Sequence, residues 1–249
     1  MILGEMTWQE VRDASRELVC VIPTGSLEQH GPHLPLLTDT LLCTAVAKQA
    51  EVRTADKSLL LPGIWLGCSA HHMAMDGTAT ASSQTYVSVL TDVVTSFMTH
   101  GFRKFLVLNG HGGNTEQNGV ALRELKRGHP NDLLSHADYY GLVGPDGEKA
   151  MQGPLKTIRH SCEAEVSMML HLHQDLVRVD KLRDDGLTLQ PKAPARLSII
   201  QNYDEITEEG SFGYSTFGTA ETGKTLVDLA VKGVSEAIEY VHAGYSLAR

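Results

Sequence analysis

The sequence predicts an α/β protein with one mostly parallel β-sheet that is covered by helices on both faces. Short apolar runs alternate with longer amphipathic segments, a pattern typical of βαβ units. The first apolar run ends in Pro and Gly, as a buried strand does where it enters a loop. No repeat or low-complexity stretch interrupts this order, and we expect one domain over residues 1–249.

The expected elements follow one another along the chain. Apolar runs that predict strands lie at 17–26, 58–67, 102–110 and 132–140. Amphipathic segments that predict helices lie at 38–52, 82–101, 114–128, 163–177 and 220–245. Thr38 is the expected N-cap of the first helix, and Gly101 and Gly128 are expected to end the next two. Residues 141–158, rich in Gly and Pro, predict a long functional loop, and residues 186–200 are expected to be irregular.

Composition and charge restrict the class of function. The formal net charge of −9 argues against nucleic acid or an anionic membrane as the main partner. The four cysteines are scattered without a CxxC pair, which fits neither a disulfide framework nor a zinc ribbon and is typical of a reducing cytosol. No signal core or membrane-spanning run is visible. We therefore expect a soluble cytoplasmic protein with a small-molecule substrate.

Three polar clusters lie where the expected strands end. "GSLEQHGPH" follows the first strand, "GCSAHHMAMDGT" the second and "NGHGGN" the third. In parallel α/β folds, ligands gather beyond the carboxyl ends of the strands. The clusters should therefore project from the same edge of the sheet and form one site.

The first cluster carries metal-ligating residue types on a stiff loop. In "GSLEQHGPHLPLLTDT" (25–40), Glu28, His30, His33 and Asp39 stand within twelve residues. The intervening glycine and prolines exclude a regular helix there. Metal ligation and a solvated polar loop are both open interpretations of this stretch alone. His33 either orients a ligand or holds the loop by hydrogen bonds.

Further His and carboxylate residues follow later in the chain. His111 in "NGHGGN" (109–114) is flanked by glycines, which also fit phosphate binding or a turn with a surface His. "RHSCEAEVSM" (159–168) places His160 ahead of a helix that begins with Glu163 and Glu165, where carboxylates also suit the helix dipole. Together with the first cluster, these residues form a set suited to one or two borderline metals. Asp39 or a Glu has two oxygens with which to bridge a metal pair.

The segments "GSLEQHGPHLPLLTDT", "NGHGGN" and "RHSCEAEVS" together resemble the creatininase family of metal-dependent amidohydrolases, over about residues 18–175. The resemblance implies a three-layer αβα fold and hydrolysis of a C–N bond, in a cyclic amide or formamide, by metal-activated water. It implies two divalent ions, with Zn²⁺ first and Mn²⁺ or Fe²⁺ as alternatives, and a homo-oligomer that is often a hexamer. The implied metal ligands are Glu28, His30, Asp39 as the bridge, His111 and Glu165, and His160 is the implied acid/base for the leaving group.

Departures from the family concern the substrate. Creatinine-cleaving members carry a ligating Glu two residues after the His of their NGH motif, where this chain has Gly113. They also enclose the substrate with tryptophans from later segments, whereas Trp8 and Trp65 both come early here. Ser161 and Cys162 replace the Ala and Gly that follow the family's catalytic His. These differences argue against creatinine, and formamides, modified peptides and cyclic sugar ketones stay open.

Other classes of function have weaker support. "GYSTFG" (213–218) is one residue out of register with a GxSxG nucleophile elbow. We interpret His171 and His173 as packing or surface residues and His72 as a residue of the substrate pocket. The remaining alternatives are hydrolysis of a C–C or ester-like bond in a cyclic sugar ketone or lactone, and a non-catalytic metal-stabilised binding protein. A sugar- or nucleotide-binding glycine loop would leave the carboxylates unexplained.

Overall fold

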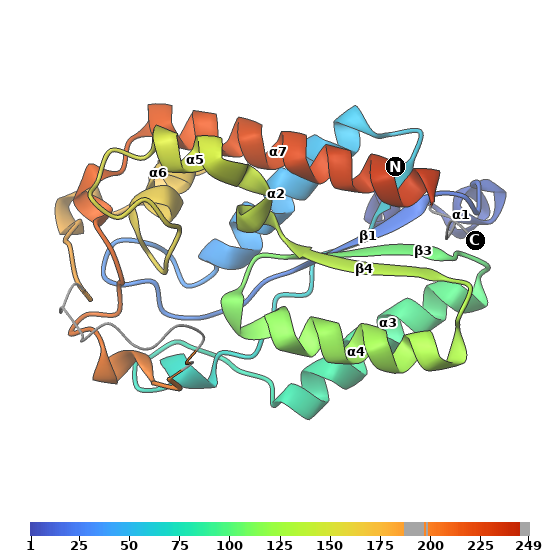
Figure 1. The fold of residues 1–249 in the computed structure, drawn as a ribbon, viewed down its shortest axis with the longest axis horizontal. Coiled ribbons are helices and arrows are strands. Elements are labelled where there is room, and N and C mark those ends of the chain that lie inside the picture. Colours follow the sequence, from blue (N-terminus) through green and yellow to red (C-terminus); the bar gives the residue numbers. More distant parts are fainter. Residues whose placement is uncertain (187–196, 198, 245–249) are drawn as a thin grey trace.

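The computed structural model describes residues 1–186, 197 and 199–244. Within these ranges, four strands form one sheet in the order β2-β1-β3-β4, and every neighbouring pair is parallel. The strands are β1 (Val19–Thr24), β2 (Ser58–Leu60), β3 (Lys104–Asn109) and β4 (Leu133–Asp138). Helices cover the sheet on both sides (Figure 1), which confirms the predicted three-layer αβα architecture.

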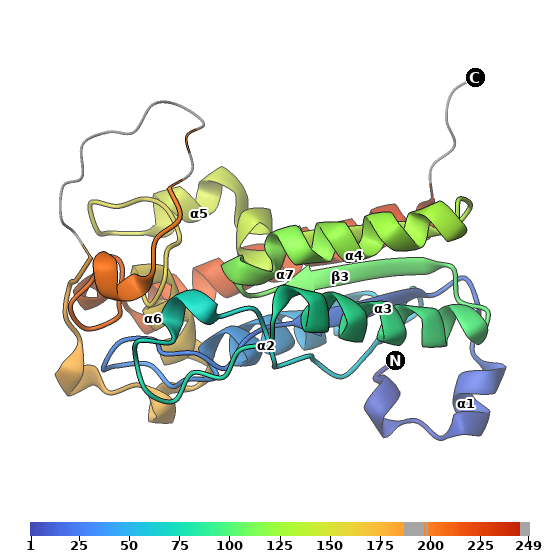
Figure 2. The ribbon, with the colours of Figure 1, turned by 90° about the horizontal axis from the view of Figure 1, so that it is seen from below.

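The helices divide between the two faces of the sheet, as Figures 1 and 2 show. One face carries α2 (Thr38–Arg53), α5 (Gly144–Ala150), α6 (Glu163–Leu172) and α7 (Ala220–Ala243); the other carries α3 (Ser83–Thr99) and α4 (Thr115–Gly128). The short helix α1 (Trp8–Asp13) precedes β1. Short 3₁₀ helices are η1 (Leu3–Glu5), η2 (Ala70–His72), η3 (Gly112–Asn114), η4 (Tyr139–Val143), η5 (Gln174–Leu176), η6 (Val179–Lys181), η7 (Tyr203–Glu205) and η8 (Ser215–Phe217).

The strands bury side chains on both faces, because successive residues of a strand point to opposite sides. Val19, Val21, Leu106 and Leu108 join the core with α2, α6 and α7, whereas Cys20, Ile22, Phe105 and Val107 join the core with α3 and α4. Complete burial of such a side chain stabilises the fold by roughly 1.5–3 kcal/mol. This double burial explains why the strands read as continuous apolar runs in the sequence.

The three longer strands end level with one another. β1 pairs with β3 from Val19↔Lys104 to Thr24↔Asn109, and β3 pairs with β4 as far as Asn109↔Asp138. The Thr24 hydroxyl donates to Oδ1 of Asn109 (3.0 Å), and Nδ2 of Asn109 donates to Oδ1 of Asp138 (2.7 Å). These side-chain hydrogen bonds fix the carboxyl edge from which the loops of the site depart.

Two sequence-based expectations about elements are wrong. Thr38 is not the N-cap of α2, because Leu37 holds that position without a side-chain cap and the Thr38 hydroxyl donates to the Pro35 carbonyl (2.6 Å). Residues 141–158 are not one long loop, since they contain α5, which begins with Gly144 and Pro145. Proline in a first helical turn forfeits no intrahelical hydrogen bond, so this sequence is compatible with a helix.

Other boundaries differ in length. The strand expected at 58–67 covers only Ser58–Leu60, and the helix expected at 163–177 ends at Leu172. Most of the segment 186–200 lies outside the described residues. All four cysteines are buried and free. No helix in the described part of the chain is long and apolar enough to cross a membrane.

Candidate metal centre and active site

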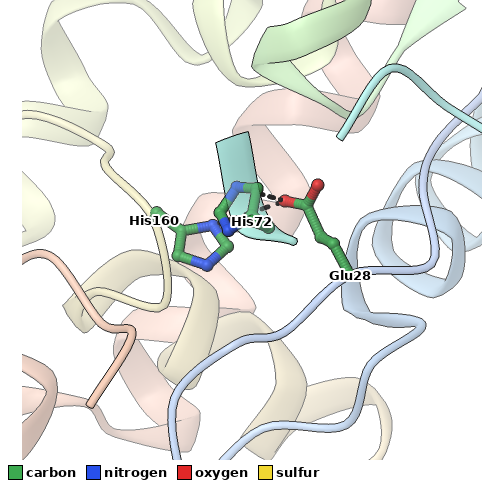
Figure 3. A group of neighbouring side chains, drawn as sticks. All are labelled: Glu28, His72 and His160. Carbon is green, nitrogen blue, oxygen red and sulfur yellow. Dashed lines mark ion pairs between the residues drawn. The ribbon is translucent and has the colours of Figure 1, made fainter. Parts of the chain in front are cut away.

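The three polar clusters meet at the carboxyl edge of the sheet, around a cavity of about 290 Å³. Figure 3 shows Glu28, His72 and His160 pointing toward one another from three separate segments. His111 joins them from the turn between β3 and η3. The five predicted ligands and His160 are all buried, which excludes the solvated-loop and surface-His interpretations. The prediction that the three clusters project from the same edge of the sheet is confirmed.

Asp39 lies between two histidines. It is in the first turn of α2, where a carboxylate suits the helix dipole. Its Oδ1 lies 3.0 Å from Nε2 of His30, and its Oδ2 lies 3.0 Å from Nδ1 of His111. The Ser26 hydroxyl donates to Oδ2 (2.7 Å). Each carboxylate oxygen therefore faces a different imidazole nitrogen, which is the arrangement that a bridging ligand needs.

Glu28 is a buried carboxylate with unsatisfied oxygens. Oε2 lies 3.2 Å from Nδ1 of His111, and Oε1 lies 3.3 Å from Nε2 of His72 and 3.5 Å from Nδ1 of His160. These approaches lack hydrogen-bond geometry, so both oxygens are without a partner in the described part of the chain, although the residue is only 1% exposed. A buried carboxylate in this state is strongly destabilising. A metal cation removes that penalty, so Glu28 fits a ligand role.

The charges of the cluster also favour a cation. Burial lowers the pKa of His30, but Asp39 and Glu165 outweigh burial and raise it to about 9. Burial raises the pKa of Glu165 to about 8, although His30 opposes this shift. A proton on His30 and a proton on Glu165 thus partly offset the negative charge of the three crowded carboxylates. Divalent ions would displace these protons. The mixed nitrogen and oxygen donors suit borderline divalent metals.

The candidate ligand atoms form compact groups. In each group the atoms lie within 4.8 Å of one another: Glu28, Asp39 and His111; His30, His160 and Glu165; Glu28, His72 and His160 (Figure 3). The five residues that the sequence singled out as ligands all belong to the first two groups. Asp39 connects these two groups, because its Oδ1 faces His30.

The tautomer of His160 follows from its surroundings. Nε2 lies 2.8 Å from the carbonyl oxygen of Gln29, and a carbonyl only accepts, so Nε2 carries the hydrogen. Nδ1 is then unprotonated and faces Oε1 of Glu28 across the cavity. Burial lowers the pKa of His160 well below its usual range, and His30 and His72 lower it further. His160 therefore presents a neutral, proton-accepting nitrogen to the cavity.

Gln29 is a site residue that the sequence analysis missed. Because Nε2 of His160 is a donor, the two hydrogens of the Gln29 amide are directed to Nδ1 of His72 (2.7 Å) and to the Gly210 carbonyl (3.0 Å). Nε2 of His72, which lies 3.3 Å from Oε1 of Glu28, then carries the ring hydrogen. The adjacency of Gln29 to Glu28 in the first cluster was the available signal.

Aromatic side chains form another part of the cavity that the sequence did not indicate. The ring of Tyr203 stacks on His72 at 4.0 Å and meets His160 edge-on at 4.6 Å. Tyr140 and Phe212 also line the cavity. His72 lies in the wall of this cavity, as predicted. Tyr203 comes from η7, far from the three polar clusters along the chain, so no local pattern pointed to it.

Two glycines of "NGHGGN" are required by close packing. A Cβ atom on Gly113 would lie 2.3 Å from the Cys68 carbonyl oxygen and 2.4 Å from Nε2 of His111. A Cβ atom on Gly110 would lie 2.7 Å from Cβ of Cys43. No side chain fits at Gly113 without a shift of the surrounding backbone, so this position cannot contribute a ligand.

Glu163 and His33 hold loops next to the site and are in none of the candidate metal groups of the described residues. Glu163 accepts the backbone N–H groups of Gln152 (2.5 Å) and Gly153 (2.8 Å), so it anchors a loop. Nε2 of His33 lies 3.1 Å from the Ser161 carbonyl, which favours its loop-holding interpretation. His171 and His173 belong to none of the candidate metal groups in the described residues.

Comparisons with known proteins agree with this geometry. The family model for creatinine amidohydrolase matches residues 4–238. The chain belongs to the creatininase family. A creatinine amidohydrolase of Pseudomonas putida is 28% identical over 260 residues, covering 96% of each chain. A mycofactocin precursor peptide peptidase of Mycobacterium tuberculosis is 29% identical over 250 residues, covering 94% of this chain and 90% of the relative.

Solved creatininase structures share the fold. A creatininase variant complexed with creatine superposes with a TM-score of 0.80 at 28% identity, covering 96% of this chain and 97% of the other. A Zn–Zn form and a Mn form of creatininase, both 27% identical with TM-scores of 0.80, cover 96% of this chain and 96% and 97% of theirs. The predicted class, a hydrolase of the creatininase family that acts on C–N bonds, is confirmed.

Proposed function

We propose that the protein is a dinuclear metal-dependent hydrolase of a small cyclic amide or formamide. The observation that carries the proposal is the pair of orphaned Glu28 oxygens beside an Asp39 whose two oxygens face different histidines. The cavity volume of about 290 Å³ lies near the lower end of the range for small-molecule pockets. We propose a compact substrate, and we propose that residues 1–249 act as one unit.

The donors divide between two metal positions. Glu28, Asp39 and His111 would hold one ion, and His30, Asp39 and Glu165 would hold the other, so that Asp39 is shared. Two divalent ions at these positions would lower the pKa of a coordinated water and polarise the carbonyl of the substrate. Zn²⁺ is our first assignment, with Mn²⁺ and Fe²⁺ as alternatives, because creatininase relatives bind zinc or manganese.

His160 would move the proton that the reaction requires. Its unprotonated Nδ1 faces the cavity, so it accepts a proton from water as the hydroxyl group adds to the carbonyl carbon. It then delivers that proton to the nitrogen as the C–N bond breaks, which balances the hydrolysis. The Gln29 carbonyl keeps Nε2 protonated throughout, so the ring needs no tautomer change. General acid–base catalysis of this kind is typically worth about 10²–10⁴ in rate.

One alternative keeps the same residues but changes the bond. A 3-dehydro-scyllo-inosose hydrolase of Thermotoga maritima is 36% identical over 109 residues, covering 43% of this chain and 34% of the relative. This similarity supports a cyclic ketone or lactone as a second substrate class. A metal-stabilised binding protein without turnover is the non-enzymatic alternative.

Metal stoichiometry tests the proposal most directly. Protein purified without a metal-affinity tag is expected to hold about two metal ions per chain by elemental analysis, and fewer in Glu28→Ala and His111→Ala. The loaded protein is then assayed on cyclic amides, formamides and lactones. No bound metal after reconstitution with Zn²⁺ or Mn²⁺ contradicts the proposal, and bound metal without any turnover favours the binding protein. Light scattering of the same sample tests the homo-oligomer, with a hexamer as the expected form.

A further inference from the structure

Among the described residues, the lining of the cavity includes one basic residue other than histidine. Arg159 lines it next to His160, and no other Arg or Lys does so among the described residues. The rest of the wall combines the carboxylates and histidines of the site with apolar and aromatic groups from Tyr140, Ile158, Tyr203, Ile206 and Phe212. An arginine in such a wall is available to bind a part of the substrate that does not react.

Arg159 has no carboxylate partner among the described residues. In the described part of the chain, four arginines lie within ion-pair distance of an Asp or Glu, and Arg159 is one of five that do not, with Arg16, Arg53, Arg123 and Arg178. The residues outside that part, 187–196, 198 and 245–249, contain no Asp or Glu. The positive charge of this exposed guanidinium is therefore not neutralised by a neighbouring acidic side chain.

The backbone under Arg159 is held firmly. The next residue but one, Ser161, has a φ of 51° and donates its hydroxyl to the His30 carbonyl (2.7 Å). The Phe212 N–H donates to the His160 carbonyl (2.8 Å), and the Arg159 guanidinium lies over the Phe212 ring at 5.6 Å. A cation–π contact with an aromatic face restrains a guanidinium while leaving its N–H groups available to bind an anion.

We propose that Arg159 binds a carboxylate of the substrate, and that the preferred substrates are compact amides carrying this group away from the scissile bond. The inference rests on the proposed function. A planar carboxylate matches the paired donors of a guanidinium, and a cavity of about 290 Å³ suits a compact substrate. Two divalent ions would outweigh the three carboxylates of the site by one positive charge, and Arg159 adds a second.

Matched substrate pairs test this assignment. 5-Oxoproline and N-formylglycine are compared with their primary amides, which keep the shape and remove the charge. We expect the zinc-loaded wild type to prefer each acid in kcat/KM, and calorimetry to show tighter binding of the acid. Arg159→Gln is expected to reduce the acid-to-amide ratio about tenfold or more while the amides change by less than about twofold. Arg159→Lys should restore part of the ratio, and Arg127→Gln, on the exposed face of α4, should leave it unchanged.

The two readouts separate this inference from the proposed function. An unchanged acid-to-amide ratio in Arg159→Gln, in turnover or in binding, overturns the role of Arg159, because the carboxylate is then held by the metals or elsewhere. Equal affinity of the wild type for acid and amide overturns it as well. If no pair is hydrolysed but the calorimetric ratio still depends on Arg159, the proposed reaction fails and the carboxylate subsite stands.

Discussion

The segment from β1 to β4 and the segment from η4 to η8 contribute to the same cavity but are built differently. The first supplies Glu28, His30 and His111 from the loops that follow β1 and β3, and Asp39 from the start of α2, close to a sheet edge fixed by register. The second contains no strand within its described residues and supplies Glu165 from a helix and its other site residues from loops and 3₁₀ turns. Four of the five candidate ligands come from the first segment.

This difference suggests a division of roles, in which the first segment positions the metal ions and the second forms the variable part of the cavity. Two ions that share a carboxylate require donor atoms at fixed separations, and loops and a helix start anchored to strands in fixed register provide them. Arg159, Tyr203 and Phe212 lie on connecting segments, where changes leave the sheet intact. The two segments are joined at residues 29–33, through the hydrogen bonds from His160 to Gln29 and from His33 to Ser161.

The largest effect is expected at the shared ligand of the first segment. Asp39→Asn should remove most of the bound metal and reduce turnover by at least about 10³-fold, because both metal positions depend on this carboxylate. Elemental analysis and kcat/KM measure the two losses. Glu163→Gln is the control, since this buried carboxylate anchors a loop and belongs to neither metal position. Full metal content in Asp39→Asn would contradict the bridging role.

The next effect tests whether His160, in the second segment, is a catalyst or a ligand. His160→Gln should keep about two metal ions per chain and lower kcat by about 10²–10⁴-fold. His171→Gln, on the exposed side of α6, serves as the control. Loss of one metal ion would instead place His160 in the coordination sphere, as its proximity to His30 and Glu165 allows.

The sequence predicted the first segment better than the second. Its strands and helices could be located because burial on both faces leaves a continuous apolar signal and because amphipathic helices keep their period. The polar clusters at the strand ends then predicted where Glu28, Asp39 and His111 would meet. Even here the start of α2 was misjudged, since Thr38 bonds to the Pro35 carbonyl instead of capping the helix.

In the second segment, local patterns carried less information. Gly144 and Pro145 indicated a loop, yet they begin α5, which packs against α7. The tertiary fold brings Tyr203 and Phe212 to the cavity, and no periodic pattern in the sequence indicates this. Glu165 and His160 were found only through their motif, because carboxylates in a first helical turn are common for electrostatic reasons alone.

The junction between the segments should show an intermediate effect. Gln29→Leu removes the amide that donates to His72 and Gly210 but leaves the backbone carbonyl that orients His160. We expect unchanged metal content and a kcat lower by about 10–100-fold, the usual effect of losing a group that orients active-site residues. Gln29→Glu should not restore activity, because a carboxylate cannot donate to the Gly210 carbonyl. Metal loss in Gln29→Leu would show that the junction also holds the ligands in place.

The smallest effect is expected far from the metals, at Asp185. Its carboxylate accepts the backbone N–H of Glu209 (2.7 Å) and the hydroxyl of Thr207 (2.8 Å), and it thereby fixes the stretch that leads to Gly210. Burial raises the pKa of Asp185, but these donors outweigh burial and hold the pKa below its usual range. The folded state thus binds this proton less well than the unfolded state, so the stabilisation is present above about pH 4 and is lost as the pH falls below that.

Asp185→Asn should lower the free energy of unfolding at neutral pH by about 1 kcal/mol, a modest value because the carboxylate is partly exposed. Urea unfolding of wild type and variant should give this difference near pH 7 and a smaller one near pH 3. Asp180→Asn, at an exposed position, is the control. Metal content should not change, because the first segment holds most of the ligands without help from this loop. A variant that lost metal would show that the loops of the second segment also maintain the metal geometry. That result would contradict the division of roles between the two segments.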